Sequence, residues 1–257
     1  MENLETVKFI FGEEAAIVNT LNKNYIVLSD LHIGYDLKLI EKGVKIYDST
    51  NFMADRIINL TKKFNIKDII ILGDIKESLL YPSKKEKIEI DKFFYKLKDY
   101  NITIVSGNHD AHLEELINSK IVDELVIDKI AFLHGHKLPS AEAMLSDLIL
   151  AGHNHASIEF IDENNGVYTQ KIWIIAKLNK DKTKNLYNKF NKSLTLILFP
   201  AFNNFITGTP INRPTYRHIF VGDIFNYRTA KLYSINGEYL GNPIKPKSKL
   251  TKDKFNL

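Results

Sequence analysis

The chain has 257 residues, of which 44% are hydrophobic and 26% are charged, and its formal net charge at pH 7 is +4. These values are typical of a globular protein with a substantial core, and the small positive charge does not by itself indicate a nucleic-acid partner. The sequence has no cysteine, so disulfides, zinc fingers, iron–sulfur clusters and thiol nucleophiles are excluded. Any bound metal must be held by histidine, carboxylate or amide groups.

The first residues, 1–14, include acidic side chains and no long apolar segment, so they are not typical of a signal peptide. No apolar run approaches the length of a membrane span. We therefore expect a cytoplasmic protein with no membrane partner. The sequence predicts no particular oligomeric state.

Short apolar runs alternate with helical periodicity through the first 155 residues. One amphipathic helix is expected over residues 50–64, capped by Ser49 or Thr50, and another begins near Ser83. A short helix is expected over residues 113–118. The first helix owes its apolar spacing to Phe52, Met53, Ile57, Leu60 and Phe64. The expected strands, each ending in polar residues, span 25–30, 68–74, 102–110, 130–136 and 147–155.

The last hundred residues are less periodic and richer in lysine. Residues 167–178 and 193–202 predict strands, with a basic insertion near 177–192 between them. This insertion is either a solvated loop or a contact to a nucleic-acid backbone, with Tyr187 and Phe190 stacking on bases. Residues 245–257 predict a basic, frayed tail. No repeat or linker divides the chain, so we expect one domain over residues 1–257.

Strands that alternate with helices favour an α/β fold, whose ligands collect beyond the carboxyl ends of the strands. The polar residues at the five strand ends should therefore lie together, and six of the eight histidines are among them. Those residues are Asp30 and His32, Asp74 and Glu77, Asn108, His109 and Asp110, His134 and His136, and His153 and His155.

Aspartate, asparagine and neutral histidine side chains together suit divalent Mn, Fe, Zn, Co or Ni. The set is too large for one ion and fits two ions that share a carboxylate, for which Asp74 is the candidate because its strand lies centrally. The positive charge of two divalent ions exceeds the negative charge of Asp30 and Asp74, so the site would keep a net positive charge. Such a pair is the usual clamp for in-line displacement at phosphorus.

The ordered pattern D-x-H, G-D-x-x-E, G-N-H-D, H and G-H-x-H over residues 30–155 resembles the calcineurin-like metallophosphoesterase superfamily. The segment "PAFN" (200–203) and Gly208 resemble the ICC-like group, whose bacterial relatives are linked with a DNA ligase and a large helicase. Glu77 departs from that group, whose bacterial members tend to have histidine there. The resemblance implies a four-layer sandwich of two mixed β-sheets flanked by α-helices.

The resemblance also implies the roles of individual residues. Asp74 would bind both ions, and Glu77 would fix the site through hydrogen bonds without being a ligand. His109 would act as general acid to the leaving oxygen, and Asp110 would orient the His109 ring and keep it protonated. The first ion would be held by Asp30, His32, Asp74 and His155, and the second by Asp74, Asn108, His134 and His153.

The function implied is a dinuclear phosphoesterase with Mn as the first choice of metal. We expect a phosphodiesterase that acts on nucleic acid or nucleotides through a metal-bridging hydroxide. A phosphomonoesterase and a non-catalytic protein-binding scaffold on the same fold are the alternatives. His134 is preferred to His136 as the ligand because it follows its apolar run directly. His136, Arg213 and Arg217 are candidates for substrate contact.

Overall fold

A six-stranded mixed sheet forms the first half of the protein in the computed structural model, which describes residues 6–162, 164, 166–213, 224–243 and 245–246. The three strands at one edge pair antiparallel, and the four from β3 to β6 pair parallel. In spatial order the strands are β1 (Val7–Phe9), β2 (Ala15–Asn19), β3 (Asn24–Leu28), β4 (Asp68–Ile71), β5 (Asn101–Val105) and β6 (Lys120–Val122).

A nine-stranded sheet forms the second half and is also mixed. Its order is β15-β14-β13-β11-β12-β9-β8-β7, with β10 paired to β11. Strands β8, β9 and β12 run parallel, and the other pairs are antiparallel. The predicted pair of mixed sheets is therefore confirmed. The strands are β7 (Leu125–Ile127), β8 (Ile130–Leu133), β9 (Leu148–Ala151), β10 (Ser157–Ile161), β11 (Val167–Leu178), β12 (Thr195–Leu198), β13 (Phe225–Ser234), β14 (Tyr239–Asn242) and β15 (Lys245–Pro246).

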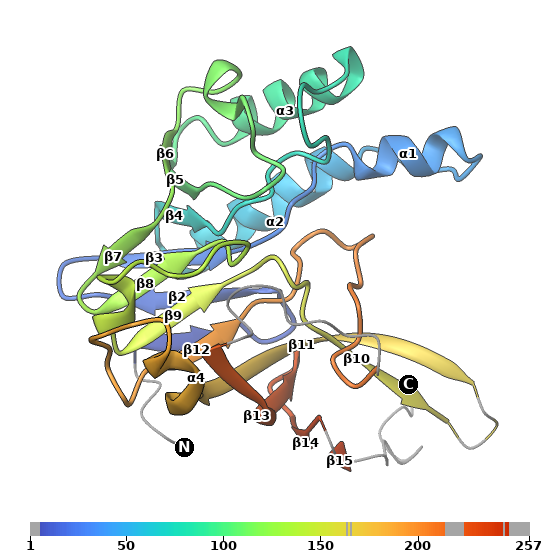
Figure 1. The fold of residues 1–257 in the computed structure, drawn as a ribbon. Coiled ribbons are helices and arrows are strands. Elements are labelled where there is room, and N and C mark those ends of the chain that lie inside the picture. The colour runs from blue at the N-terminus through green and yellow to red at the C-terminus, as the bar shows by residue number, and fades with distance from the viewer. Residues whose placement is uncertain (1–5, 163, 165, 214–223, 244, 247–257) are drawn as a thin grey trace.

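The longer helices lie on the outer side of the first sheet (Figure 1). They are α1 (Tyr35–Glu41), α2 (Ser49–Phe64) and α3 (Lys84–Lys96). The other helical segments are short: α4 (Lys180–Lys184) and the 3-10 turns Leu113–Glu115 and Ala143–Leu145. Among the described residues, no helix is both long and apolar enough to cross a bilayer.

The predicted start of α3 is correct, and that of α2 is wrong by one residue. Ser83 caps α3, and its hydroxyl accepts the Glu86 N–H at 3.2 Å. The N-cap of α2 is Asp48. Ser49 is instead the first helical residue, and its hydroxyl donates to Asp36 at 2.5 Å.

Central strands are almost continuously apolar because both of their faces are buried. In β4, Ile69 and Ile71 face the helices, while Ile70 faces the second sheet. In β9, Leu150 packs between the sheets and Ile149 packs on the outer face. Strict alternation thus divides the core into three layers. The short polar segments that follow these strands are left at one edge of the sandwich.

An aromatic group stands at the centre of the layer between the sheets. Trp173 of β11 is fully buried and stacks on Phe9 of β1 with ring centroids 4.3 Å apart. Phe199 meets the same indole edge-on at 4.7 Å. Since Phe9 and Trp173 come from different sheets, this contact joins the two halves of the sandwich.

The structure describes the whole of the basic insertion and two residues of the predicted tail. The insertion begins within β11 and includes α4. Tyr187 and Phe190 pack against the core on the outer face of the second sheet, and the Tyr187 hydroxyl donates to the Pro139 carbonyl at 2.5 Å. Their rings are therefore not free to stack on bases. Residues 245–246 of the predicted frayed tail form β15, and the rest of that tail lies outside the described residues.

Replacing Trp173 by alanine should lower the free energy of unfolding by about 3–5 kcal/mol, since it removes a large buried ring from the contact between the sheets. Urea titration followed by circular dichroism measures the change. The matched control is Phe11→Ala, because Phe11 is 76% exposed. Equal effects of the two substitutions would contradict the central place given to Trp173.

Candidate metal centre

Five strands deliver their polar ends to one edge of the sandwich. Strands β3, β4 and β5 come from the first sheet, and β8 and β9 from the second. Parallel strands end on the same side, so their following loops meet there. The ends also bond to one another: the Asp30 N–H donates to the Gly73 carbonyl at 3.1 Å, and the His32 N–H to the Asp74 carbonyl at 2.8 Å.

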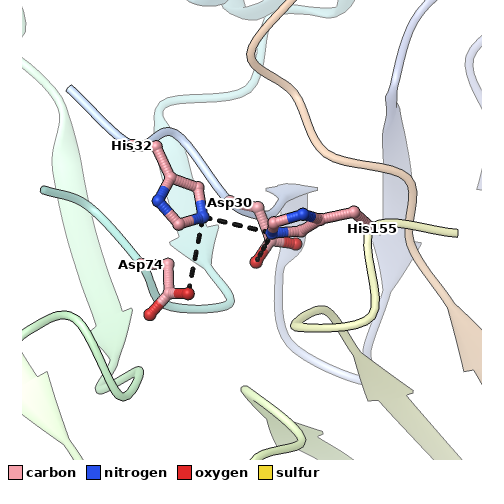
Figure 2. Close-up of side chains that lie close together, drawn as sticks. All are labelled: Asp30, His32, Asp74 and His155. Atoms are coloured by element: carbon pink, nitrogen blue, oxygen red, sulfur yellow. Dashed lines mark hydrogen bonds and ion pairs between the residues drawn. The ribbon is translucent and has the colours of Figure 1, made fainter. Parts of the chain in front are cut away.

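The first cluster consists of Asp30, His32, Asp74 and His155, whose ligand atoms all lie within 4.8 Å of one another. Figure 2 shows the two imidazoles and two carboxylates turned toward a common space. His155 Nε2 lies 3.4 Å from Asp30 Oδ1 and 3.1 Å from His32 Nε2. His32 Nε2 lies 3.5 Å from Asp74 Oδ2. These are the four residues predicted to hold the first ion.

The second cluster consists of Asp74, His134 and His153, within the same mutual distance. His134 Nε2 lies 3.2 Å from Asp74 Oδ2 and 3.1 Å from His153 Nδ1. The Asn108 side-chain oxygen is 3.2 Å from the same His134 nitrogen. The structure thus brings together the residues predicted for the second ion. Asp74 belongs to both clusters.

Five of these candidate ligands have left-handed backbones. The φ angles of Asp30, His32, Asp74, His153 and His155 lie between 42° and 67°. Each such conformation costs about 1–3 kcal/mol outside glycine and persists only where the surroundings enforce it. Close packing supplies that enforcement: a Cβ on Gly107 would lie 2.2 Å from Asp74 Oδ1, and one on Gly152 1.7 Å from Ser29 Oγ.

Burial and charge together set the protonation of the clusters. Burial raises the pKa of Asp30, but His155 and His134 beside it hold that pKa below its usual range. The pKa of Asp74 is also lowered, against its burial, by His134 and His32. Burial lowers the pKa of His134, but Asp74 and Asp30 outweigh it and raise that pKa to about 9. Burial and the neighbouring His134 lower the pKa of His153 to about 4.

This donor set fits divalent transition-metal ions. Buried carboxylates and imidazoles with their ligand atoms 3.1–3.5 Å apart need a shared cation or proton to balance them. Aspartate oxygen with several histidine nitrogens is a borderline set that suits Mn, Fe, Zn, Co or Ni.

Glu77 links the first cluster to His109. Its Oε2 accepts from His32 Nδ1 at 2.9 Å, which leaves His32 Nε2 for a metal. Its other oxygen accepts from Lys38 at 2.5 Å. Its backbone carbonyl accepts from His109 Nδ1 at 2.7 Å. Burial raises the pKa of Glu77, but His32 and Lys38 overcome this and lower it.

The histidine expected to be the general acid is held by that carbonyl. Because a carbonyl can only accept, His109 Nδ1 must carry hydrogen, and Nε2 is the atom free to exchange a proton. The His109 ring packs edge-on to His32, with centroids 4.8 Å apart. His109, His32 and Glu77 lie close enough to form a third ligand group, but their hydrogen bonds account for that closeness.

Asp110 does not orient His109, so that prediction is wrong. One of its oxygens accepts the N–H groups of Gly107 and Asp74, and the other accepts the N–H of Ile75, all at 2.8 Å. The carboxylate therefore joins the loops after β4 and β5. Burial raises its pKa, although the bond from Gly107 opposes the rise.

Two buried residues that the sequence analysis missed fix the Glu77 segment. Lys76 is fully buried, and its ammonium donates to the carbonyls of Ser78 at 2.5 Å and Leu80 at 2.6 Å. Glu86 accepts the N–H groups of Glu77 and Ser78, each at 2.9 Å. The spacing Ser83-x-x-Glu86 is a capping-box signal. That signal predicts that the Glu86 side chain caps the start of α3, and it gives no indication of the bonds to Glu77 and Ser78.

Ser29 and Asn203 support the loop after β3 and were also missed. The Ser29 hydroxyl donates to Asp30 Oδ2 at 2.6 Å. The Asn203 side chain donates to the Leu31 carbonyl at 2.8 Å. Gly208 packs on the His155 backbone, where an added Cβ would lie 2.0 Å from the carbonyl oxygen. The only sequence signal for Asn203 and Gly208 was their part in the resemblance.

The candidate substrate contacts have different surroundings. The His136 ring centroid is 5.3 Å from that of His134, and its buried Nδ1 has no hydrogen-bond partner among the described residues. Burial and His134 lower the pKa of His136 to about 4. The Arg213 guanidinium, a candidate for substrate contact, is ion-paired with Glu159. Arg217 lies outside the described residues.

Metal affinity should rise with pH toward 9. Below its pKa of about 9, metal-free His134 carries a proton that a metal must displace. The apparent association constant for Mn should therefore increase by up to about tenfold per pH unit between pH 6.5 and 8.5. Calorimetric titration in buffers of different ionisation enthalpy should show proton release. Binding that is independent of pH with no proton release would contradict this protonation state.

Replacing Glu77 by alanine should weaken Mn binding by about tenfold to 100-fold, because His32 loses the carboxylate that orients its ring. Glu77→Gln keeps an acceptor oxygen and should give a smaller loss. Equilibrium Mn titration measures both, with the exposed Glu142→Ala as control. If Glu77→Ala bound Mn as tightly as the control, the contact would not support the centre.

Comparison with known proteins bears on the identity of this centre. The family model for the calcineurin-like phosphoesterase superfamily domain matches residues 24–175. No curated protein was found to match the sequence.

Two solved structures are similar to this chain at low sequence identity. The nuclease MPE of Pseudomonas putida is 18% identical with a TM-score of 0.55, over 90% of this chain and 97% of that one. The phosphoesterase Yfce of E. coli is 13% identical with a TM-score of 0.38, over 84% of this chain and 96% of that one. Since the family match covers more than half of the sequence, the chain belongs to the calcineurin-like phosphoesterase superfamily.

Proposed function

We propose that this protein is a phosphodiesterase that cleaves nucleic acid or nucleotides at a dinuclear centre, with Mn as the favoured metal. The observation that carries the proposal is the shared carboxylate of Asp74, which belongs to both ligand clusters. His109 completes the arrangement beside the first cluster. Membership of the phosphoesterase superfamily supports the reaction class.

The side chains leave the centre attractive to an anion. Asp30 and Asp74 supply the negative charge, while Asn108 and neutral histidines supply none. Two bound divalent ions would lower the pKa of a water molecule and neutralise charge on the phosphate. Since the ions bring more charge than the two carboxylates return, the chain's own residues favour a phosphate ester.

His109 has the placement of a general acid. Its Nδ1–H is held by the Glu77 carbonyl, so its Nε2 can present a proton to a leaving oxygen. The edge-on contact with His32 keeps the ring beside the first cluster. Asp110 takes no part in this proton transfer, because its oxygens are bonded to backbone N–H groups.

Two observations support a diester substrate over a monoester. The solved structure with a TM-score of 0.55 is described as a nuclease, which supports a diester substrate here. The exposed lysines of the basic insertion near 177–192 would add attraction to a polyanion. A scaffold without catalysis is disfavoured because the two ligand clusters and His109 are present together.

His109→Ala should keep both metal ions and lose about 10²- to 10⁴-fold in turnover, since it removes the proton donor and no metal ligand. Hydrolysis of bis-p-nitrophenyl phosphate with added Mn measures turnover, and elemental analysis measures metal content. His112→Ala is the matched control, because His112 stacks on Tyr81 outside both clusters.

Three results would overturn parts of this proposal. Loss of metal from His109→Ala would make His109 a ligand. Faster hydrolysis of p-nitrophenyl phosphate than of the diester would favour a monoesterase. If added Mn restored no hydrolysis of either compound to the unaltered protein, the scaffold alternative would replace the enzyme.

A further inference from the structure

A wide apolar hollow adjoins the loop that carries the candidate ligands Asp30 and His32, because its lining residue Asn203 donates to that loop. Its volume is about 490 Å³, within the range of small-molecule sites. We call it the aromatic groove. It lies between the segment that joins α1 to α2, the start of α2 and the segment after β12. Its principal lining residues are Val44, Tyr47, Phe52, Met53, Asn204 and Phe205.

The groove exposes three aromatic side chains to solvent. Tyr47 is 88% exposed, Phe52 55% and Phe205 39%. The helical spacing of α2 placed Phe52 with the residues facing the core, yet its ring lines the groove instead. Several large apolar side chains exposed together mark a binding surface more often than a chance arrangement.

The groove adjoins the loop that carries two candidate ligands. Asn203, which also lines it, donates to the Leu31 carbonyl at 2.8 Å and to the His32 carbonyl at 3.4 Å. The segment that supplies Asn203 and Phe205 continues to Gly208 against His155. The groove and the first cluster are therefore held by the same stretch of chain.

One wall of the groove is fixed before any ligand binds. Arg56 donates to the Phe202 carbonyl at 3.0 Å and to Asn204 Oδ1 at 2.8 Å, and its guanidinium covers the Phe202 ring at 4.1 Å. Lys171 donates to the Ala201 and Asn203 carbonyls, both at 2.8 Å.

The charges around the groove favour an anionic partner. Lys45 lines it, and Lys42 is exposed just before it. Of the nearby acids, Asp48 accepts from Asn51 at 2.5 Å and lies 3.5 Å from Lys92, while Glu41 is exposed. Aromatic faces with lysines between them suit a strand of bases and phosphates.

We propose that the aromatic groove binds an unpaired base of a single-stranded nucleic acid whose neighbouring phosphate lies at the metal centre. Tyr47, Phe52 and Phe205 stack on the base, and Lys45 meets the backbone. A duplex hides its base faces, so the groove selects single strands. The inference rests on the proposed phosphodiesterase function and names its substrate class.

The test measures binding to a fluorescent single-stranded DNA oligomer by anisotropy, using His109→Ala protein in Mn so that the strand is not cleaved. Adding Tyr47→Ala or Phe52→Ala should weaken binding about tenfold, while Tyr47→Phe keeps the ring and should bind like the parent. Phe11→Ala is the control for an exposed ring elsewhere. An abasic oligomer of equal length should bind weakly and show little difference between variants.

Separate arms distinguish failure of this inference from failure of the proposed function. Hydrolysis of bis-p-nitrophenyl phosphate by the unaltered protein tests the function alone. If that activity is present but Tyr47→Ala and Phe52→Ala bind the oligomer like the control, the groove proposal is overturned. Equal losses on the abasic oligomer, or a change only in self-association or in binding to phosphatidylcholine vesicles, would also overturn it.

Discussion

The rest of the centre depends on the buried carboxylate of Asp74. It follows β4, the strand that lies between β3 and β5, so it can face ligands from either side. One of its oxygens accepts the backbone N–H of His109 at 2.9 Å, and the other lies 3.2 Å from His134 Nε2. A buried carboxylate among histidines is costly unless a cation balances it. The glycine at 107 and the carboxylate of Asp110 serve to hold this one group in place.

Glu77 connects the candidate metal ligands to the candidate general acid. The Glu77 side chain bonds a candidate ligand, and its main chain bonds the candidate acid. Lys76 and Glu86 use buried charges to fix that segment. Buried charged groups are kept only where their hydrogen bonds are satisfied, so this loop has few alternative conformations.

The sequence predicted the strands and the candidate ligands because both leave local signals. Apolar runs such as 68–74 are short and end in polar residues, and the ligands follow them directly. The predicted roles of Asp110, Phe52 and Tyr187 were wrong, because the surroundings of these side chains are set by segments distant in the chain. Strands β1, β2, β6, β7 and β10 and those after β12 were missed, since they end in no motif. Lys76 and Glu86 could not be assigned because their partners are backbone atoms, which carry no residue identity.

The origin of the ligands has a consequence for how the molecule holds together. Asp30, His32 and Asp74 follow strands of the first sheet, whereas His153 and His155 follow a strand of the second. A metal bound among them is therefore a cross-link between the two sheets at their open edge. Because such a cross-link forms only in the folded sandwich, free metal stabilises that sandwich by mass action. Chelation would therefore weaken the contact between the two sheets as well as remove metal from the centre.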